Sequence, residues 1–219
     1  MPNSFRTIVP CLARALLLAC CLAMPASASA LLVTVLKRDG HPLSGAVITA
    51  EAETGVPGAA PPLRAIMDQV NLAFVPDVLV VPLHSTVLFP NSDVVGHQVY
   101  SFSSARQFQL PLYRGKPYPP VQFDQPGIVT LGCNIHDNMI GYIVVTAAPF
   151  YGRSDARGEW QQHDLPAGRY RVRVWHPLLN ETQELMQSFD SAAGEKLEFR
   201  LSKALRPAPL TGRPHSWDY

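Results

Sequence analysis

Residues 132–139 read Gly-Cys-Asn-Ile-His-Asp-Asn-Met, so the thiol of Cys133, the imidazole of His136 and the thioether of Met139 lie within seven residues. Apolar segments typical of β-strands flank this stretch on both sides, at residues 128–131 and 142–146. Two strands this close leave a tight turn, and side chains in such a turn converge on one point. The spacing Cys-x2-His-x2-Met therefore predicts a metal-binding loop between two strands.

A further nitrogen ligand is available 36 positions upstream of the cysteine, at His97. Two imidazoles, one thiolate and one weak thioether make the ligand set of a mononuclear blue copper site, whereas tetrahedral zinc is expected to recruit a stronger fourth ligand. Taken singly, each of these residues is more often structural or buried in a core. Their joint order and spacing favour the site, so we predict one copper ion held by His97, Cys133, His136 and Met139. The other histidines are expected in surface or turn roles: His41, His84, His163, His176 and His215.

The first 30 residues resemble a secretory signal peptide. Arg6 and Arg14 precede the apolar segment 15–24, and small residues lead to a predicted cleavage site after Ala30. The apolar segment is well short of the roughly 20 residues that a membrane-spanning helix needs. We therefore expect an exported, periplasmic protein. Anchoring as a lipoprotein cut before Cys20 is the minor alternative.

Cleavage would leave Cys133 as the single cysteine, because the other three lie in the signal. No intramolecular disulfide is then possible, and a free thiol in an oxidising compartment is at risk unless a metal holds it. The mature chain would have 189 residues, enough for one large or two small domains. Its 16 basic and 17 acidic side chains leave almost no net charge, so the composition does not predict binding to nucleic acid or to a membrane surface.

Short segments rich in valine, isoleucine, leucine and aromatic residues recur along the chain, separated by glycine, proline, asparagine or aspartate turns. This pattern is typical of an all-β sandwich or barrel. The last segment, residues 203–219, lacks periodic apolar residues and is expected to be a flexible tail. The expected strands are residues 31–37, 46–52, 78–81, 86–89, 97–102, 128–131, 142–146, 170–175 and 197–201.

Two stretches resemble halves of the carboxypeptidase-regulatory-like (prealbumin-like) β-sandwich. The first half is carried by Asp39, Gly40, Pro42, Gly45, Ala46 and Ile48. The second is carried by Ser154, Asp155, Gly158, Trp160, Leu165, Pro166, Gly168 and Tyr170. About a hundred residues that contain every predicted ligand separate the halves, so we expect a copper domain at 63–148 inserted in or packed on a small sandwich made of 31–53 plus 150–202. The alternative is a single elongated sandwich.

The ligand pattern resembles that of the cupredoxins, and the short spacing inside residues 133–139 is similar to that of amicyanin. The whole chain resembles methylamine-utilization-type proteins that pair such a domain with a carboxypeptidase-regulatory-like segment. The resemblance implies a Greek-key cupredoxin β-sandwich. In the family the residue after the first ligand is commonly asparagine, which ties the two ligand loops together, and here it is Gln98. Asp137 and Asn138 replace the more apolar residues of amicyanin, which bears on which redox partner docks.

These observations predict a one-electron carrier in periplasmic electron transfer that binds a redox protein transiently. A periplasmic copper carrier or chaperone is the first alternative, although such proteins often use several methionines. The second is an extracytoplasmic binding module in which the prealbumin-like sandwich acts and the metal is incidental. We expect no enzyme, because no catalytic triad, paired-carboxylate or phosphate-loop signature stands out.

Overall fold

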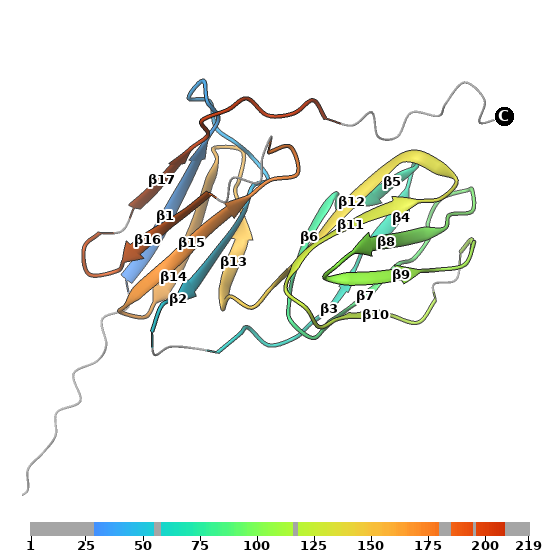
Figure 1. The fold of residues 1–219 in the computed structure, drawn as a ribbon, viewed down its shortest axis with the longest axis horizontal. Helices are drawn as coiled ribbons and strands as arrows, with labels where there is room; N and C mark the ends of the chain where they lie inside the picture. The colour runs from blue at the N-terminus through green and yellow to red at the C-terminus, as the bar shows by residue number, and fades with distance from the viewer. Residues whose placement is uncertain (1–28, 55–57, 116–117, 180–184, 195, 209–219) are drawn as a thin grey trace, which may run out of the picture.

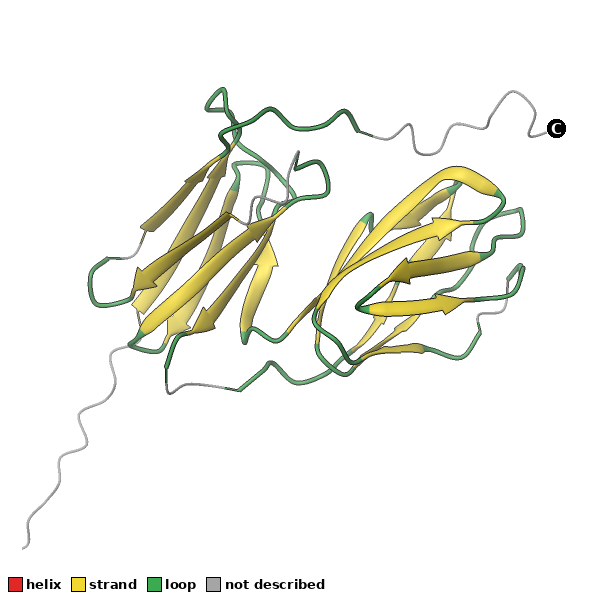
Figure 2. Cartoon of the chain, in the orientation of Figure 1, coloured by secondary structure: helices red, strands yellow, loops and turns green. Residues whose placement is uncertain are grey.

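The computed structural model describes residues 29–54, 58–115, 118–179, 185–194 and 196–208. Every regular element among them is a β-strand (Figure 2), which confirms the all-β class. The described residues contain no helix with the length and hydropathy required to span a bilayer. The predicted signal lies outside them except for its last two residues, and the predicted tail is described only to residue 208.

The first and last parts of the chain form one pair of sheets, which we call the flanking sandwich. Its strand orders are β14-β1-β17 and β13-β2-β15-β16. Alternate residues of these strands point into one apolar core, as in Leu31, Val33 and Val35 of β1. The strands are β1 (Ser29–Leu36), β2 (Val47–Ala52), β13 (Phe150–Arg153), β14 (Glu159–Leu165), β15 (Arg169–Trp175), β16 (Leu185–Asp190) and β17 (Lys196–Arg200).

The middle of the chain forms the second pair of sheets, which we call the site sandwich. A five-stranded sheet of order β6-β12-β11-β8-β9 faces a three-stranded sheet of order β10-β7-β3, with the β4-β5 hairpin beside them. The strands are β3 (Arg64–Ile66), β4 (Asp68–Val70), β5 (Ala73–Val75), β6 (Val78–Pro82), β7 (Ser85–Leu88), β8 (Val99–Ser103), β9 (Arg106–Gln109), β10 (Val121–Phe123), β11 (Gly127–Cys133) and β12 (His136–Thr146).

The connections of the site sandwich cross between its sheets. Strand β10 lies in the three-stranded sheet although its neighbours in sequence, β9 and β11, lie in the five-stranded one. Strand β6 pairs in parallel with β12, and β8 pairs with β11. Crossed connections of this kind define a Greek-key sandwich. They bring the loop before β8 next to the turn between β11 and β12.

The two sandwiches lie side by side (Figure 1) and touch through the outer faces of one sheet each. Val47 and Trp175 of the flanking sandwich pack with Val78, Val144 and Tyr142 of the site sandwich. The rings of Tyr142 and Trp175 meet edge to face at 5.5 Å. Beyond this contact the sheets diverge and leave a cleft of about 610 Å³.

All nine predicted strands are present, and most of their ends are shifted by one or two residues. Strand β12 begins six residues earlier than predicted, so His136 and Met139 lie in the strand rather than in a loop. Eight further strands were not predicted. Six of them have three or four residues, too few to show a period of two. Five of the seven residues of β14 are polar, and so are three of the six in β16. The proposed division into an inserted and a host domain stays a prediction.

Candidate metal centre

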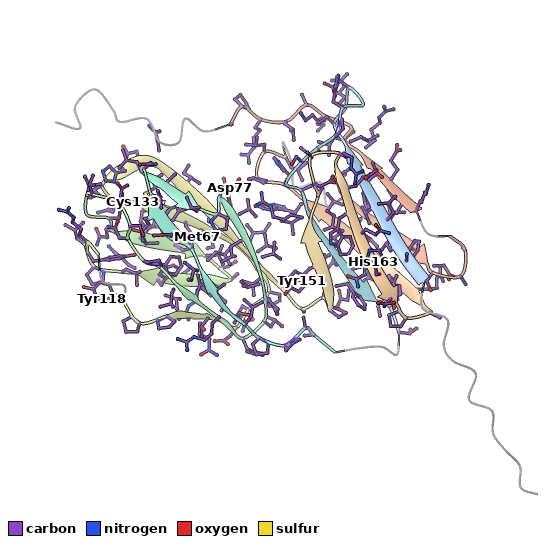
Figure 3. All side chains as sticks on the ribbon, turned by 180° about the vertical axis from the view of Figure 1, so that it is seen from behind. Met67, Asp77, Tyr118, Cys133, Tyr151 and His163 are labelled. Atoms are coloured by element: carbon purple, nitrogen blue, oxygen red, sulfur yellow. The ribbon has the colours of Figure 1, made fainter. Side chains whose placement is uncertain are left out.

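Two loops carry the predicted ligands. Cys133 is the last residue of β11 and His136 the first residue of β12, so both stand at the turn of one hairpin. His97 lies just before β8 and forms an isolated bridge with Tyr113, each N–H donating to the other's C=O at 3.0 Å. Because β8 pairs with β11 next to this turn, residues 36 positions apart meet at one end of the sandwich. In Figure 3, Cys133 lies toward the end of the site sandwich that points away from the flanking sandwich.

Three donor atoms converge at this end. The Nδ1 atoms of His97 and His136 lie 3.1 Å apart, and they lie 3.6 and 3.5 Å from Sγ of Cys133. A point equidistant from the three atoms lies about 2 Å from each, close to the length of a metal–nitrogen bond. Two imidazoles and one thiolate in a triangle are the in-plane ligands of a blue copper site. The residues present therefore fit a copper ion.

Met139 lies on the same face as the cysteine. The register of β11 with β12 shifts between Gly132 and Cys133, so that three residues of β12 bulge out beyond His136. From Met139 to Ile143, alternate residues of β12 are buried, and Met139 is in the same core cluster as Cys133. Its role as a weak axial ligand stays a prediction.

The Cys133 thiol has a pKa below that of an ordinary cysteine. Burial alone would raise its pKa, but hydrogen bonds from His97 and from the backbone of Gln98 and Ile135 outweigh burial and lower the pKa to about 6. The side chain is buried and forms no disulfide. A thiolate at neutral pH is the form that binds metal.

Two contacts hold the loops together. The Asn134 side-chain amide donates to Oε1 of Gln98 at 3.0 Å, and the Asn134 N–H donates to the Gln98 C=O at 3.1 Å. Gln98 therefore makes the link between ligand loops that the family expectation gives to asparagine. Next to the cysteine, Gly132 lies under the ring of Tyr100, where a Cβ would come within 2.7 Å of ring atoms.

Asp93 is a site residue that the sequence reasoning missed. Its Oδ2 lies 3.2 Å from Nε2 of His97, and both side chains are nearly inaccessible to solvent. Burial would raise the pKa of the Asp93 carboxyl, but hydrogen bonds from the Leu72 N–H and from His97 outweigh it and lower the pKa. An acidic residue four positions before a candidate ligand was the available signal.

Most of the remaining histidines lie elsewhere. His41 and His84 are exposed and pair with Asp39 and Asp124. His176 accepts a hydrogen bond from the Leu178 N–H in a turn after β15. His163 lies in β14, and His215 lies outside the described residues.

No protein-family model and no curated protein matches the chain. Solved structures do. A purple cupredoxin from Nitrosopumilus maritimus is 22% identical over 37% of this chain and 99% of that chain, with a TM-score of 0.34. A pseudoazurin from Sinorhizobium meliloti is 24% identical over 38% of this chain and 74% of that chain, with a TM-score of 0.30. Amicyanin structures match as well, and these likenesses concern the fold alone.

One similar structure is an enzyme. A copper-containing nitrite reductase from Thermus scotoductus is 25% identical over 51% of this chain and 28% of that chain, with a TM-score of 0.36. The expectation that this chain is no enzyme is therefore wrong as an inference from sequence signatures, because an enzyme is among the proteins that resemble it.

Proposed function

We propose that the protein is an exported type 1 copper protein that carries single electrons in the periplasm. The observation that carries this proposal is the triangle of His97 Nδ1, His136 Nδ1 and Cys133 Sγ, built at the end of an all-β sandwich. Copper bound there would supply a one-electron couple between its two oxidation states. Met139, buried in the same core cluster as the cysteine, would complete the ligand set.

The surrounding residues support this role by keeping the ligands in place. His97 is fully buried, and its backbone is tied to Tyr113 by two hydrogen bonds. The link between Gln98 and Asn134 joins its loop to the cysteine loop. A ligand set that stays fixed reorganises little when its charge changes, which favours fast electron transfer.

A transient redox protein would dock where the ligand loops reach the surface. Val94 and Ile135 are exposed and lie beside the two loops that bring His97 and His136. Redox proteins meet in short encounters through small interfaces, which the exposed part of these loops can provide. Asp137 is exposed in the same loop, so its charge contributes to partner choice. We also propose that the chain is related to methylamine-utilization-type proteins. In this proposal the flanking sandwich is a carboxypeptidase-regulatory-like module.

The decisive experiment adds Cu(II) to residues 29–219, which retain all of β1, and records the visible spectrum. We expect one copper per chain and an intense thiolate-to-copper charge-transfer band that is absent in Cys133→Ser. Met186→Leu is the matched control, because it changes an exposed methionine on the flanking sandwich and should leave the band unchanged. A colourless complex, or only weak absorption, would refute the proposal. A reversible redox couple distinguishes an electron carrier from a copper carrier.

A further inference from the structure

The loop before β8 places a carboxylate behind the buried ligand. Oδ2 of Asp93 is 3.2 Å from Nε2 of His97, and 7% of the Asp93 side chain and none of the His97 side chain is exposed. When Nδ1 of His97, which faces Cys133 and His136, binds the metal, Nε2 is the ring nitrogen that carries the proton, and its N–H donates a hydrogen bond to the carboxylate.

The carboxylate is itself held on several sides. The Leu72 N–H donates to Oδ2 at 2.8 Å, the Val94 N–H donates to Oδ1 at 2.8 Å, and the Asp93 N–H donates to Asn91 Oδ1 at 2.9 Å. The Asn91 amide in turn donates to the C=O groups of Val95 and Tyr113. Asp93 therefore has a fixed position relative to the histidine rather than a choice of rotamers.

The donor at Leu72 comes from an unusual turn. Asn71 and Leu72 form the two-residue loop between β4 and β5, with φ angles of 51° and 58°. Two-residue hairpin loops commonly need positive φ at both positions, which asparagine adopts readily and leucine rarely does. Strain of this kind persists where surrounding structure holds it, and it is common at functional sites. Here it aims a backbone N–H at the carboxylate that faces the buried ligand.

We propose that Asp93 is a positioning residue that fixes the orientation of His97 and favours the oxidised state of the copper. This inference rests on the proposed function and adds to it a residue that regulates the reduction potential. A buried negative charge behind a ligand raises the basicity of that ligand and stabilises the metal ion of higher charge. The effect is strong because solvent screens little at a site this buried.

The test measures reduction potentials of copper-loaded Asp93→Asn and of Asp137→Asn. Both variants remove one carboxylate near the site, but Asp137 is exposed and its charge is screened by solvent. We expect Asp93→Asn to keep the blue band and to shift the ratio of oxidised to reduced protein at least tenfold toward the reduced form, equal to about 59 mV. The affinity for Cu(II) should fall roughly 10- to 100-fold. Asp137→Asn should shift the ratio several-fold less.

A structural role alone would not move the potential. If Asp93→Asn has the same potential as the wild type, or shifts it no further than Asp137→Asn does, the inference is overturned while the proposed function stands. A wild-type protein without the blue band overturns both. Asp93→Ser removes the same charge with a smaller side chain and replaces Asp93→Asn if that variant does not fold. In metal-free protein, the His97 Nε2 proton, followed by NMR, should exchange with solvent faster in either variant than in the wild type.

Discussion

The two sandwiches differ most in what their cores contain. The flanking sandwich buries aliphatic and aromatic side chains together with two serines, Ser154 and Ser191. The site sandwich buries several larger polar groups, and they gather at the end where the ligands lie: Gln69, Asn91 and His97. A buried polar group costs free energy unless it is fully hydrogen-bonded. The difference indicates that stability alone explains the first core, whereas the second core also supports a site.

The largest expected effect comes from removing one buried aromatic ring from each core in turn. Phe199→Ala in the flanking sandwich and Phe123→Ala in the site sandwich each remove a buried ring, at a cost of about 3–5 kcal/mol. Residues 63–148 contain no tryptophan, and Trp160 packs against the core of the flanking sandwich, so tryptophan fluorescence in a Trp175→Phe background reports that sandwich. The copper band reports the other. We expect each variant to lower the denaturation midpoint of its own probe. If both midpoints fall together in both variants, the sandwiches unfold as one unit and the comparison fails.

Acid should weaken the flanking sandwich through His176. Burial, together with the charge of Arg153, lowers its pKa from 6.5 to about 4. The folded state binds fewer protons than the unfolded state between these values, so the stabilisation is complete above pH 6.5 and is lost as the pH falls through 4. The loss approaches about 3 kcal/mol. His176→Gln should flatten the dependence of the fluorescence midpoint on pH between 6.5 and 4, and an unchanged slope would contradict the assignment.

Much of this comparison could be foreseen from the sequence, and some could not. Apolar periodicity predicted the nine principal strands, and ligand spacing predicted that His136 would lie beside Cys133. The spacing could not reveal Asp93, because its role depends on the strained turn at Leu72 that meets it from another hairpin. Short strands such as β10 form only because neighbours pair with them, so no local pattern marks them.

A tyrosine in each core gives a finer test of the difference. The Tyr113 hydroxyl is buried, donates to the Phe89 C=O and accepts from the Gln69 amide. Tyr113→Phe removes both of these buried hydrogen bonds, although the Gln69 amide keeps its bond to the Pro90 C=O, and should cost about 1–3 kcal/mol, measured by the copper band. Tyr170 is also buried but makes a single hydrogen bond, to the half-buried Pro166 C=O, so Tyr170→Phe should cost about 1 kcal/mol or less by fluorescence. Equal costs would show that removing a buried hydroxyl destabilises the two cores to the same extent, which would contradict the comparison.

The smallest effect concerns the contact between the sandwiches. Arg153 of the flanking sandwich donates to the Asp77 carboxylate at 3.2 Å and to the Val78 C=O at 3.0 Å. The Asp77 side chain is 72% exposed, so its ion pair contributes less than about 1 kcal/mol. Asp77→Asn should therefore leave the separation between the two midpoints unchanged.

Arg153→Gln removes more, because it also deletes the donor to the Val78 backbone and the guanidinium that lies against Gly45. We expect this variant to separate the fluorescence and copper-band midpoints further, since the sandwiches then share fewer interactions. A copper-band midpoint that falls as far as the fluorescence midpoint would mean that the site sandwich depends on its neighbour for stability.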